Sequence, residues 1–260
     1  MKNSPDRATP FWRRLQEALL AQARVQLISD HYVLAPWLTP QSIVLDLGAN
    51  VGDFSREISS AFGCHCVAVE PAPANFLKIP AAALITKLPF AAGAKPGAGR
   101  LFLAEHVQSH SLFAAGDAEA ADALSVPIEI LPYRGLLAKA ALARIDLLKI
   151  DIEGAEWGFI EEISSEDLRQ IPQITVEFHD FVPALRNQCR TPQVCRRLRE
   201  LGFVCIQDTR RGTYNTLFVN THHVAITWRL RTLLRGILLC GKIRQWVNGA
   251  RRRLGQPPTS

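Results

Sequence analysis

Between residues 43 and 70 the spacing of hydrophobic residues changes from that of a strand to that of a helix and back again. Residues 43–47 form an apolar run around Asp46, as in a buried strand of a parallel sheet. From residue 53 onward apolar residues recur at helical spacing until Gly63, which suits the position just after a helix. A second apolar run, residues 66–69, ends at Glu70. The pattern predicts two strands joined by a glycine-containing loop and a helix.

The alternation of strands and helices continues over residues 42–220. Further strands are expected at 82–86, 90–94, 101–103, 126–131, 145–152, 174–179, 203–207 and 216–219, and further helices at 134–143, after Gly154 and at 191–201. A helix at 11–29 is expected before this span. Such alternation with short links predicts an α/β domain with a mostly parallel sheet and helices on both faces. We divide the chain into an N-terminal helical extension (1–41), this domain (42–220) and a basic amphipathic C-terminal tail (221–260).

The first loop has the features of a site for a nucleotide-like ligand. Gly48 and Gly52 lack a Cβ and so allow close backbone approach, and the free N–H groups of the following helix meet polar ligand atoms. Glu70 follows about twenty residues later, where doubly wound folds place the acid that binds ribose hydroxyls. The spacing Asp46-x-Gly48-x-x-x-Gly52 differs from the dinucleotide fingerprint. A purely structural turn is the alternative.

A second group of polar residues ends the strand at 145–152. Lys149, Asp151 and Glu153 alternate with isoleucines, so they project to one face of the strand. Three charged groups at the end of a buried strand are costly unless they pair or meet a ligand. The carboxyl ends of strands are also where open α/β sheets bind ligands. We therefore predict a catalytic role, with a structural ion pair of Lys149 as the alternative.

Glu177 and His179 repeat this arrangement on the next strand. The ordinary pKa of histidine lies near working pH, so His179 is a candidate general base. Glu177 would orient it or hold substrate hydroxyls. Together with Asp151 and Glu153, these two residues could instead bind one divalent metal. We assign no metal ligands from the sequence.

Four segments carry a resemblance to a known family. They are Val-Leu-Asp-Leu-Gly-Ala-Asn-Val-Gly-Asp-Phe-Ser at 44–55, Glu70-Pro71, Leu-Lys-Ile-Asp-Ile-Glu-Gly-Ala-Glu at 148–156, and Val-Glu-Phe-His at 176–179. In order and spacing they resemble the FkbM family of S-adenosylmethionine-dependent methyltransferases. The resemblance implies a Rossmann-like class I fold with a mostly parallel seven-stranded sheet. It also implies methyl transfer to an oxygen, often in a saccharide, glycolipid or natural product.

The resemblance also implies roles for individual residues. Gly48, Asn50 and Gly52 would contact the methionine end of S-adenosylmethionine, with Asp46 shaping the loop. Glu70 would bind the ribose, and Ser111 would border the adenine pocket. Two other readings remain open. One is a nicotinamide-dependent oxidoreductase, disfavoured because the third fingerprint glycine and a Tyr-x-x-x-Lys pair are missing. The other is a non-catalytic Rossmann-like protein recruited through its tail.

Charge and cysteine content narrow the choice of partners and compartment. The net charge of +6 comes from residues 221–260, which hold eight basic and no acidic residues, leaving 22 basic against 24 acidic groups elsewhere. The domain itself therefore gives no support for a nucleic-acid partner. The six cysteines lack zinc spacing and are expected to be reduced thiols. With no apolar signal region near Met1, we expect a cytoplasmic protein that acts on a small-molecule or glycan acceptor.

The tail predicts an amphipathic helix over 226–242. Its apolar stripe would comprise Ile226, Leu230, Leu233, Leu234, Ile237 and Cys240, with Arg231, Arg235 and Lys242 opposite. A cationic amphipathic helix without acidic residues suits an anionic membrane surface, so we expect peripheral membrane contact through 226–253. The alternative is that the stripe packs on the domain. The oligomeric state does not follow from the sequence.

Overall fold

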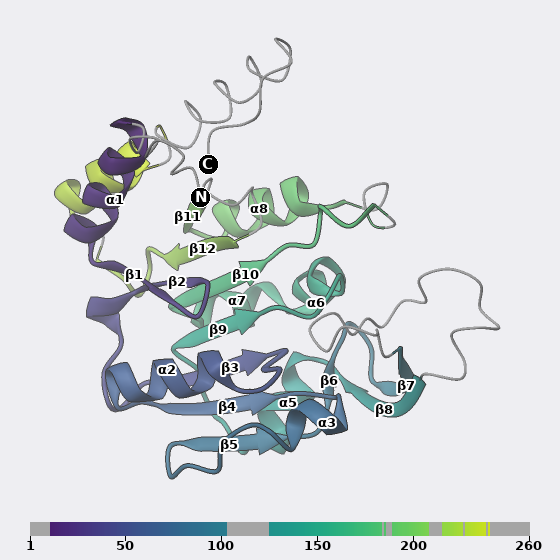
Figure 1. The fold of residues 1–260 in the computed structure, drawn as a ribbon. Coiled ribbons are helices and arrows are strands. Elements are labelled where there is room, and N and C mark those ends of the chain that lie inside the picture. The colour runs from purple at the N-terminus through teal and green to yellow at the C-terminus, as the bar shows by residue number, and fades with distance from the viewer. Residues whose placement is uncertain are drawn as a thin grey trace, which may run out of the picture.

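The fold is built on one seven-stranded sheet, shown in Figure 1. The computed structural model describes residues 11–102, 125–183, 185, 189–207, 215–225, 227–237 and 239. The strand order is β11-β12-β10-β9-β3-β4-β5, and β12 alone runs antiparallel to its neighbours. The strands are β3 (Ile43–Leu47), β4 (His65–Val69), β5 (Ile85–Leu88), β9 (Leu147–Ile150), β10 (Gln173–Glu177), β11 (Phe203–Gln207) and β12 (Asn215–Asn220). The predicted fold class is confirmed.

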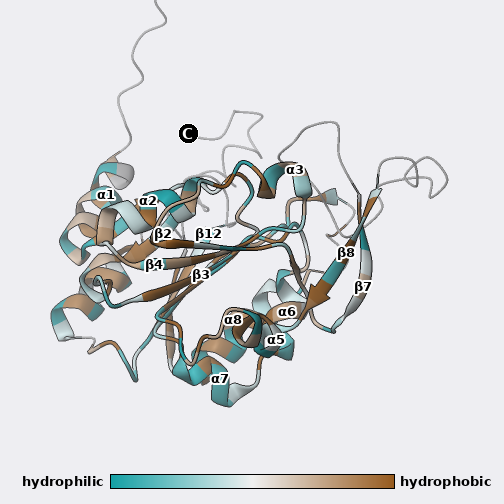
Figure 2. Ribbon diagram, turned by 90° about the horizontal axis from the view of Figure 1, so that it is seen from below, coloured by the Kyte–Doolittle hydropathy of each residue, from teal (hydrophilic) through white to brown (hydrophobic). Residues whose placement is uncertain are grey.

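Helices cover both faces of this sheet, as Figure 2 shows. One face carries α5 (Tyr133–Lys139), α6 (Glu156–Glu162), α7 (Ser165–Gln170) and α8 (Thr191–Glu200). The other face carries α1 (Phe11–Ala23) and α2 (Asp53–Phe62), and α3 (Pro73–Phe76) lies beyond the end of β4. The largest core cluster joins the sheet to the first group and includes Phe159, Phe178 and Phe218, all fully buried. The central strands are short, buried and mostly apolar, which explains why their sequence signal is strong.

A separate three-stranded sheet lies beside α3 and α5. It consists of β6 (Ala91–Ala92), β7 (Gly97–Phe102) and β8 (Ser125–Leu131) in the order β6-β8-β7. The weak strand predictions at 90–94 and 101–103 therefore fall on short or shifted strands of this second sheet. The prediction at 174–179 is too long, because β10 ends at Glu177 and leaves His179 beyond the strand.

The N-terminal extension is only partly helical. The helix predicted over 11–29 ends at Ala23, and the chain continues as the hairpin β1 (Val25–Ile28) and β2 (His31–Leu34). A short 3₁₀ turn, η1 (Ala35–Trp37), follows. β2 lies against β10 and β12. The Gln173 side chain exchanges two hydrogen bonds with the backbone of Leu34, at 2.8 and 3.2 Å, so the hairpin is an integral layer over the sheet.

The tail packs on the domain where it is described. Residues 228–237 are helical, and Leu234 and Ile237 are buried against a cluster that includes Leu20 and Val219. For this part of the predicted apolar stripe, the structure therefore supports packing on the domain, the alternative to membrane contact. Ile226, Cys240 and Lys242 lie outside the described residues. Among those described, no helix is long and apolar enough to cross a membrane, and the five described cysteines are free thiols.

Candidate active site

The loop between β3 and α2 is held against the end of β9. Gly48 has φ +74°, and a Cβ built on it would lie 1.7 Å from the carbonyl oxygen of Asp151. Gly52 has φ +86°, and its Cβ would lie 3.0 Å from atoms of Ile79 and Pro80. The sequence suggested glycines that admit a ligand. The structure gives a second reason for glycine at these two positions, because other parts of the protein already occupy the space that their Cβ atoms would take.

Glu70 lies between the loops that follow β3 and β4. Its Oε2 accepts a hydrogen bond from the backbone N–H of Asn50, and its Oε1 accepts one from Ala72, each at 2.8 Å. Burial raises the pKa of this carboxyl to about 7, against the opposing effect of the two N–H groups. The buried Oδ1 of Asn50 has no hydrogen-bond partner among the described residues. Carboxylate, orphan amide oxygen and glycine loop thus fit a ligand that carries hydroxyl and ammonium donors.

Asp46 and Lys149 form a buried pair beneath the loop. Lys149 Nζ lies 3.1 Å from Asp46 Oδ1 and donates to the carbonyl oxygen of Gly48 at 2.7 Å. The other oxygen of Asp46 accepts the hydroxyl of Ser55 at 2.6 Å. Burial opposes the charge of Lys149, but Asp46 and Asp151 outweigh it and raise its pKa above the ordinary value. Lys149 is only 3% exposed. Its burial and its contacts favour a structural ion pair, the alternative to the predicted catalytic role.

Asp151 and Glu153 follow β9 and reach solvent. Their side chains are 26% and 32% exposed. Asp151 Oδ2 lies 3.4 Å from Lys149 Nζ. Burial would raise the pKa of Asp151, yet Lys149, His31 and His179 together outweigh burial and hold this pKa below its usual range. Because β9 ends at Ile150 and Glu153 adopts φ +53°, the two acids gather through a turn and not through strand alternation.

His179 lies among three carboxylates. Its Nδ1 donates to Glu156 Oε1 at 2.9 Å, and its Nε2 lies 3.1 Å from Glu153 Oε2 and 3.9 Å from Asp151 Oδ1. Burial would lower the pKa of His179, but the bonds to Glu153 and Glu156 outweigh it and raise it to about 11. A ring that already carries both protons cannot accept another. These contacts therefore favour a positioning role for His179 over the predicted role of general base.

Glu177 completes the row of acids at the edge. Burial and the neighbouring Asp151 raise its pKa to about 7. Among the described residues it forms no ion pair, whereas Asp151 pairs with Lys149 and Glu153 with His179. Of the predicted catalytic carboxylates, Glu177 is the one for which the described part of the chain supplies no ion-pair partner.

Sequence reasoning missed two residues of this site. Glu156 is fully buried, and its Oε1 accepts from His179 and from the backbone N–H groups of Ile152 and Gly154. The Glu-Gly-x-Glu sequence at residues 153–156 was the feature that could have pointed to it. His31 comes from the N-terminal hairpin, with Nε2 3.8 Å from Asp151 Oδ2. Burial lowers the pKa of this ring below its ordinary value, against the opposing effect of Asp151. Ser111 lies outside the described residues.

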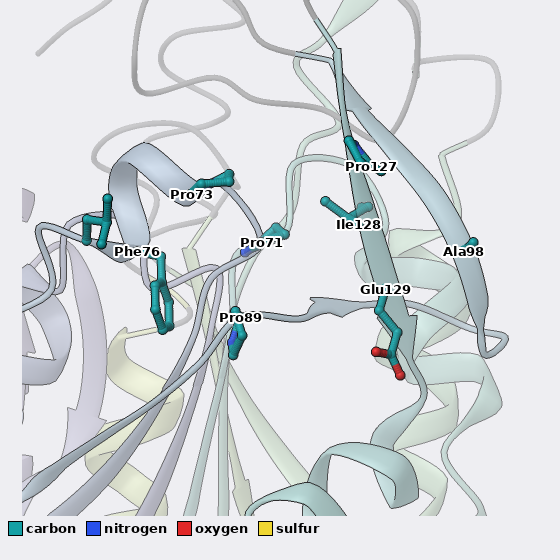
Figure 3. A pocket seen from close by; sticks show the side chains of 9 residues that line it. Pro71, Pro73, Phe76, Pro89, Ala98, Pro127, Ile128 and Glu129 are labelled. Carbon is teal, nitrogen blue, oxygen red and sulfur yellow. The ribbon is translucent and has the colours of Figure 1, made fainter.

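An apolar pocket of about 590 Å³ opens directly after Glu70 (Figure 3). Phe76 and Pro73 lie on one side of it, and Pro127 and Ile128 of β8 lie on the other. The remaining lining residues are Pro71, Leu77, Pro89, Ala98 and Glu129. The pocket therefore borders the residue that follows Glu70 in the chain, and it has apolar walls with a single carboxylate, that of Glu129.

Residues 46–205 match the model of the methyltransferase FkbM domain. That span is more than half of the chain and contains both loops and the whole row of acids. The chain belongs to the FkbM methyltransferase family. Its cofactor is S-adenosylmethionine, and the site residues described above fit such a ligand.

The chain also shows similarity to solved structures, at low sequence identity. The methyltransferase FkbM of Methylobacillus flagellatus KT is 12% identical with a TM-score of 0.48, covering 80% of this chain and 57% of that one. Aeropyrum pernix fibrillarin with natively bound S-adenosyl-L-methionine is 11% identical with a TM-score of 0.40, covering 80% and 75%. This chain thus spans little more than half the length of the first structure. No curated protein matches it.

Proposed function

We propose that this FkbM methyltransferase transfers a methyl group to a hydroxyl of a saccharide, a glycolipid or a related natural product. The carboxylates of Asp151, Glu153 and Glu177 support this proposal, because they form a partly exposed row at the ends of β9 and β10. Carboxylates accept hydrogen bonds from hydroxyl groups, and several in a row suit a polyhydroxylated acceptor. The row adjoins the cofactor loop, since Gly48 packs on the backbone of Asp151.

The residues divide into a cofactor end and an acceptor end. Glu70 and the loop around Asn50 hold the ribose and the methionine end, and the pocket beyond Pro71 takes the adenine. S-adenosylmethionine supplies an electrophilic methyl on a sulfonium whose departure needs no acid. The remaining task for the protein is to align the acceptor oxygen and to remove its proton.

Glu177 is our candidate for the group that takes this proton. The choice rests on contacts, since the neighbouring acids Asp151 and Glu153 are each tied to a cation. The side chain is half-buried, so it can face an acceptor placed over the edge of the sheet. His179 and Glu156 fix the position of Glu153 from the opposite side.

Methyl transfer to a panel of glycans and glycolipids tests the proposal. Isotope-labelled S-adenosylmethionine would be supplied, and mass spectrometry would locate the label on oxygen or nitrogen. Glu177→Gln should lower turnover by about a hundredfold, the scale for loss of a positioned base, with cofactor affinity unchanged. Glu161→Gln, on the outer helix α6, is the matched control and should retain activity. Label on nitrogen, or full turnover in Glu177→Gln, would overturn this assignment.

A further inference from the structure

Three side chains direct ligand atoms to a common point at the edge of the sheet. The side chains of Asp151, Glu153 and His179 each offer one ligand atom, and these atoms all lie within 4.8 Å of one another. The Nε2 of His179 is 3.1 Å from Glu153 Oε2 and 3.9 Å from Asp151 Oδ1. Two ligands that share one metal ion at about 2.0–2.2 Å each lie at this kind of separation.

Glu156 fixes the histidine in the orientation that a metal requires. Its Oε1 accepts the Nδ1 proton of His179 at 2.9 Å and is itself held by the N–H groups of Ile152 and Gly154. Metal-binding histidines characteristically donate their second ring nitrogen to such a carboxylate, which sets the tautomer and the ring orientation. Here it leaves Nε2 directed at the two partly exposed acids.

The opposite side of Asp151 is less suitable for a cation. His31, Asp151 and Glu177 form a second grouping with ligand atoms within 4.8 Å. Asp151 Oδ2, the oxygen nearest to His31, lies 3.4 Å from the ammonium of Lys149, which would repel a metal ion. The other oxygen, Oδ1, lies 3.9 Å from His179 Nε2, and the side chains of Asp151 and Glu153 are both partly exposed.

The geometry points to a divalent cation site formed by Asp151 Oδ1, Glu153 Oε2 and His179 Nε2. One nitrogen and two carboxylate ligands suit an ion such as Mn²⁺. The cation would take the place of the Nε2 proton, which leaves to solvent. At this site it would bind two neighbouring hydroxyls of the acceptor, a role that rests on the proposed function, whereas cation binding itself does not.

Titration of the full chain with Mn²⁺ alone, followed by electron paramagnetic resonance of the free ion, tests the site. One equivalent should bind. Glu153→Gln and His179→Gln should each weaken binding by roughly tenfold or more, at least the loss seen when a metal-site partner is removed. Glu177→Gln is the matched control and should bind as wild type. Thermal melts of each variant establish that it is folded.

Three results would overturn the site. They are no binding to the wild-type protein, equal binding by Glu153→Gln, and a loss of binding confined to Glu177→Gln. Mn²⁺ binding together with methylation of nitrogen would instead overturn the proposed O-methyl transfer and leave the cation site standing. The two proposals therefore fail separately.

Discussion

Gly48 joins the cofactor loop to the acceptor side, because its backbone packs on the carbonyl group of Asp151. A methyl group here would clash with backbone and would also disfavour the φ of +74°. We predict that Gly48→Ala lowers the free energy of unfolding by about 1–3 kcal/mol, the usual range for overpacking. Urea denaturation measures this. Gly97→Ala, which meets no atom within 4 Å, is the control and should change little.

The Glu70 carboxyl makes cofactor affinity dependent on pH. Its pKa is raised to about 7 by burial, so it is protonated in the free protein below that pH. Ribose hydroxyls donate to the ionised form, so the Kd for S-adenosylmethionine should rise by up to about tenfold per pH unit below pH 7 and stay constant above it. The cofactor-free protein should in turn become less stable as the pH rises from 4.5 to 7, because the unfolded chain releases this proton at a lower pH than the folded protein does.

Glu70→Gln is the variant that checks this origin. Calorimetric titration between pH 5.5 and 8.5 should show a flat affinity profile in the variant and a sloping one in the wild-type protein. A slope that survives in Glu70→Gln would mean that another group controls the pH dependence.

The residues found from sequence are those whose signal is local. Gly48 and Glu70 belong to a strand–loop–helix–strand unit, in which spacing alone fixes their places. His31 had no such signal, since a hairpin far away in sequence brings it to Asp151. The raised pKa of His179 depends on Glu153, in the turn after β9, and on Glu156, the first residue of α6. Its protonation state was therefore not predictable from its place after a strand.

At the scale of elements, the tail shows what hydrophobic periodicity leaves open. The stripe predicted a helix correctly over 228–237, but a stripe does not specify which apolar surface covers it. The structure supplies α1 and the outer side of β12. The N-terminal helix prediction failed over residues 24–29, where Arg24 adopts φ +56° and the chain turns into β1.

The packed tail yields a stability prediction. Ile237 is fully buried, so Ile237→Ala should cost about 2–5 kcal/mol of unfolding free energy, the range for truncating a core aliphatic side chain. Arg235→Ala, an exposed change on the same helix, should stay within about 0.5 kcal/mol. Chemical denaturation of both variants measures the difference. Equal stability would mean that this helix does not pack on the domain in solution.

At the scale of the whole molecule, the surface of the tail helix is basic. Arg229, Arg231 and Arg235 are exposed and form no ion pair among the described residues. We still expect attachment to anionic membranes, now through charge alone, with about 1 kcal/mol for each arginine near the surface. Flotation should show binding to anionic but not neutral liposomes, weakened by salt and by changing all three arginines to glutamine. Binding that ignores lipid charge would refute it.

The proposed cofactor end, at β3 and β4, is separate from the proposed acceptor end, at β9 and β10. Calorimetric titration of S-adenosylmethionine into the wild-type protein, Glu70→Ala and Glu177→Gln tests this separation most directly. Glu70→Ala should weaken binding by about 1–3 kcal/mol, because the ribose hydroxyls lose a charged acceptor. Glu177→Gln should bind as the wild-type protein does. Unchanged affinity in Glu70→Ala, or lost affinity in Glu177→Gln, would contradict the account.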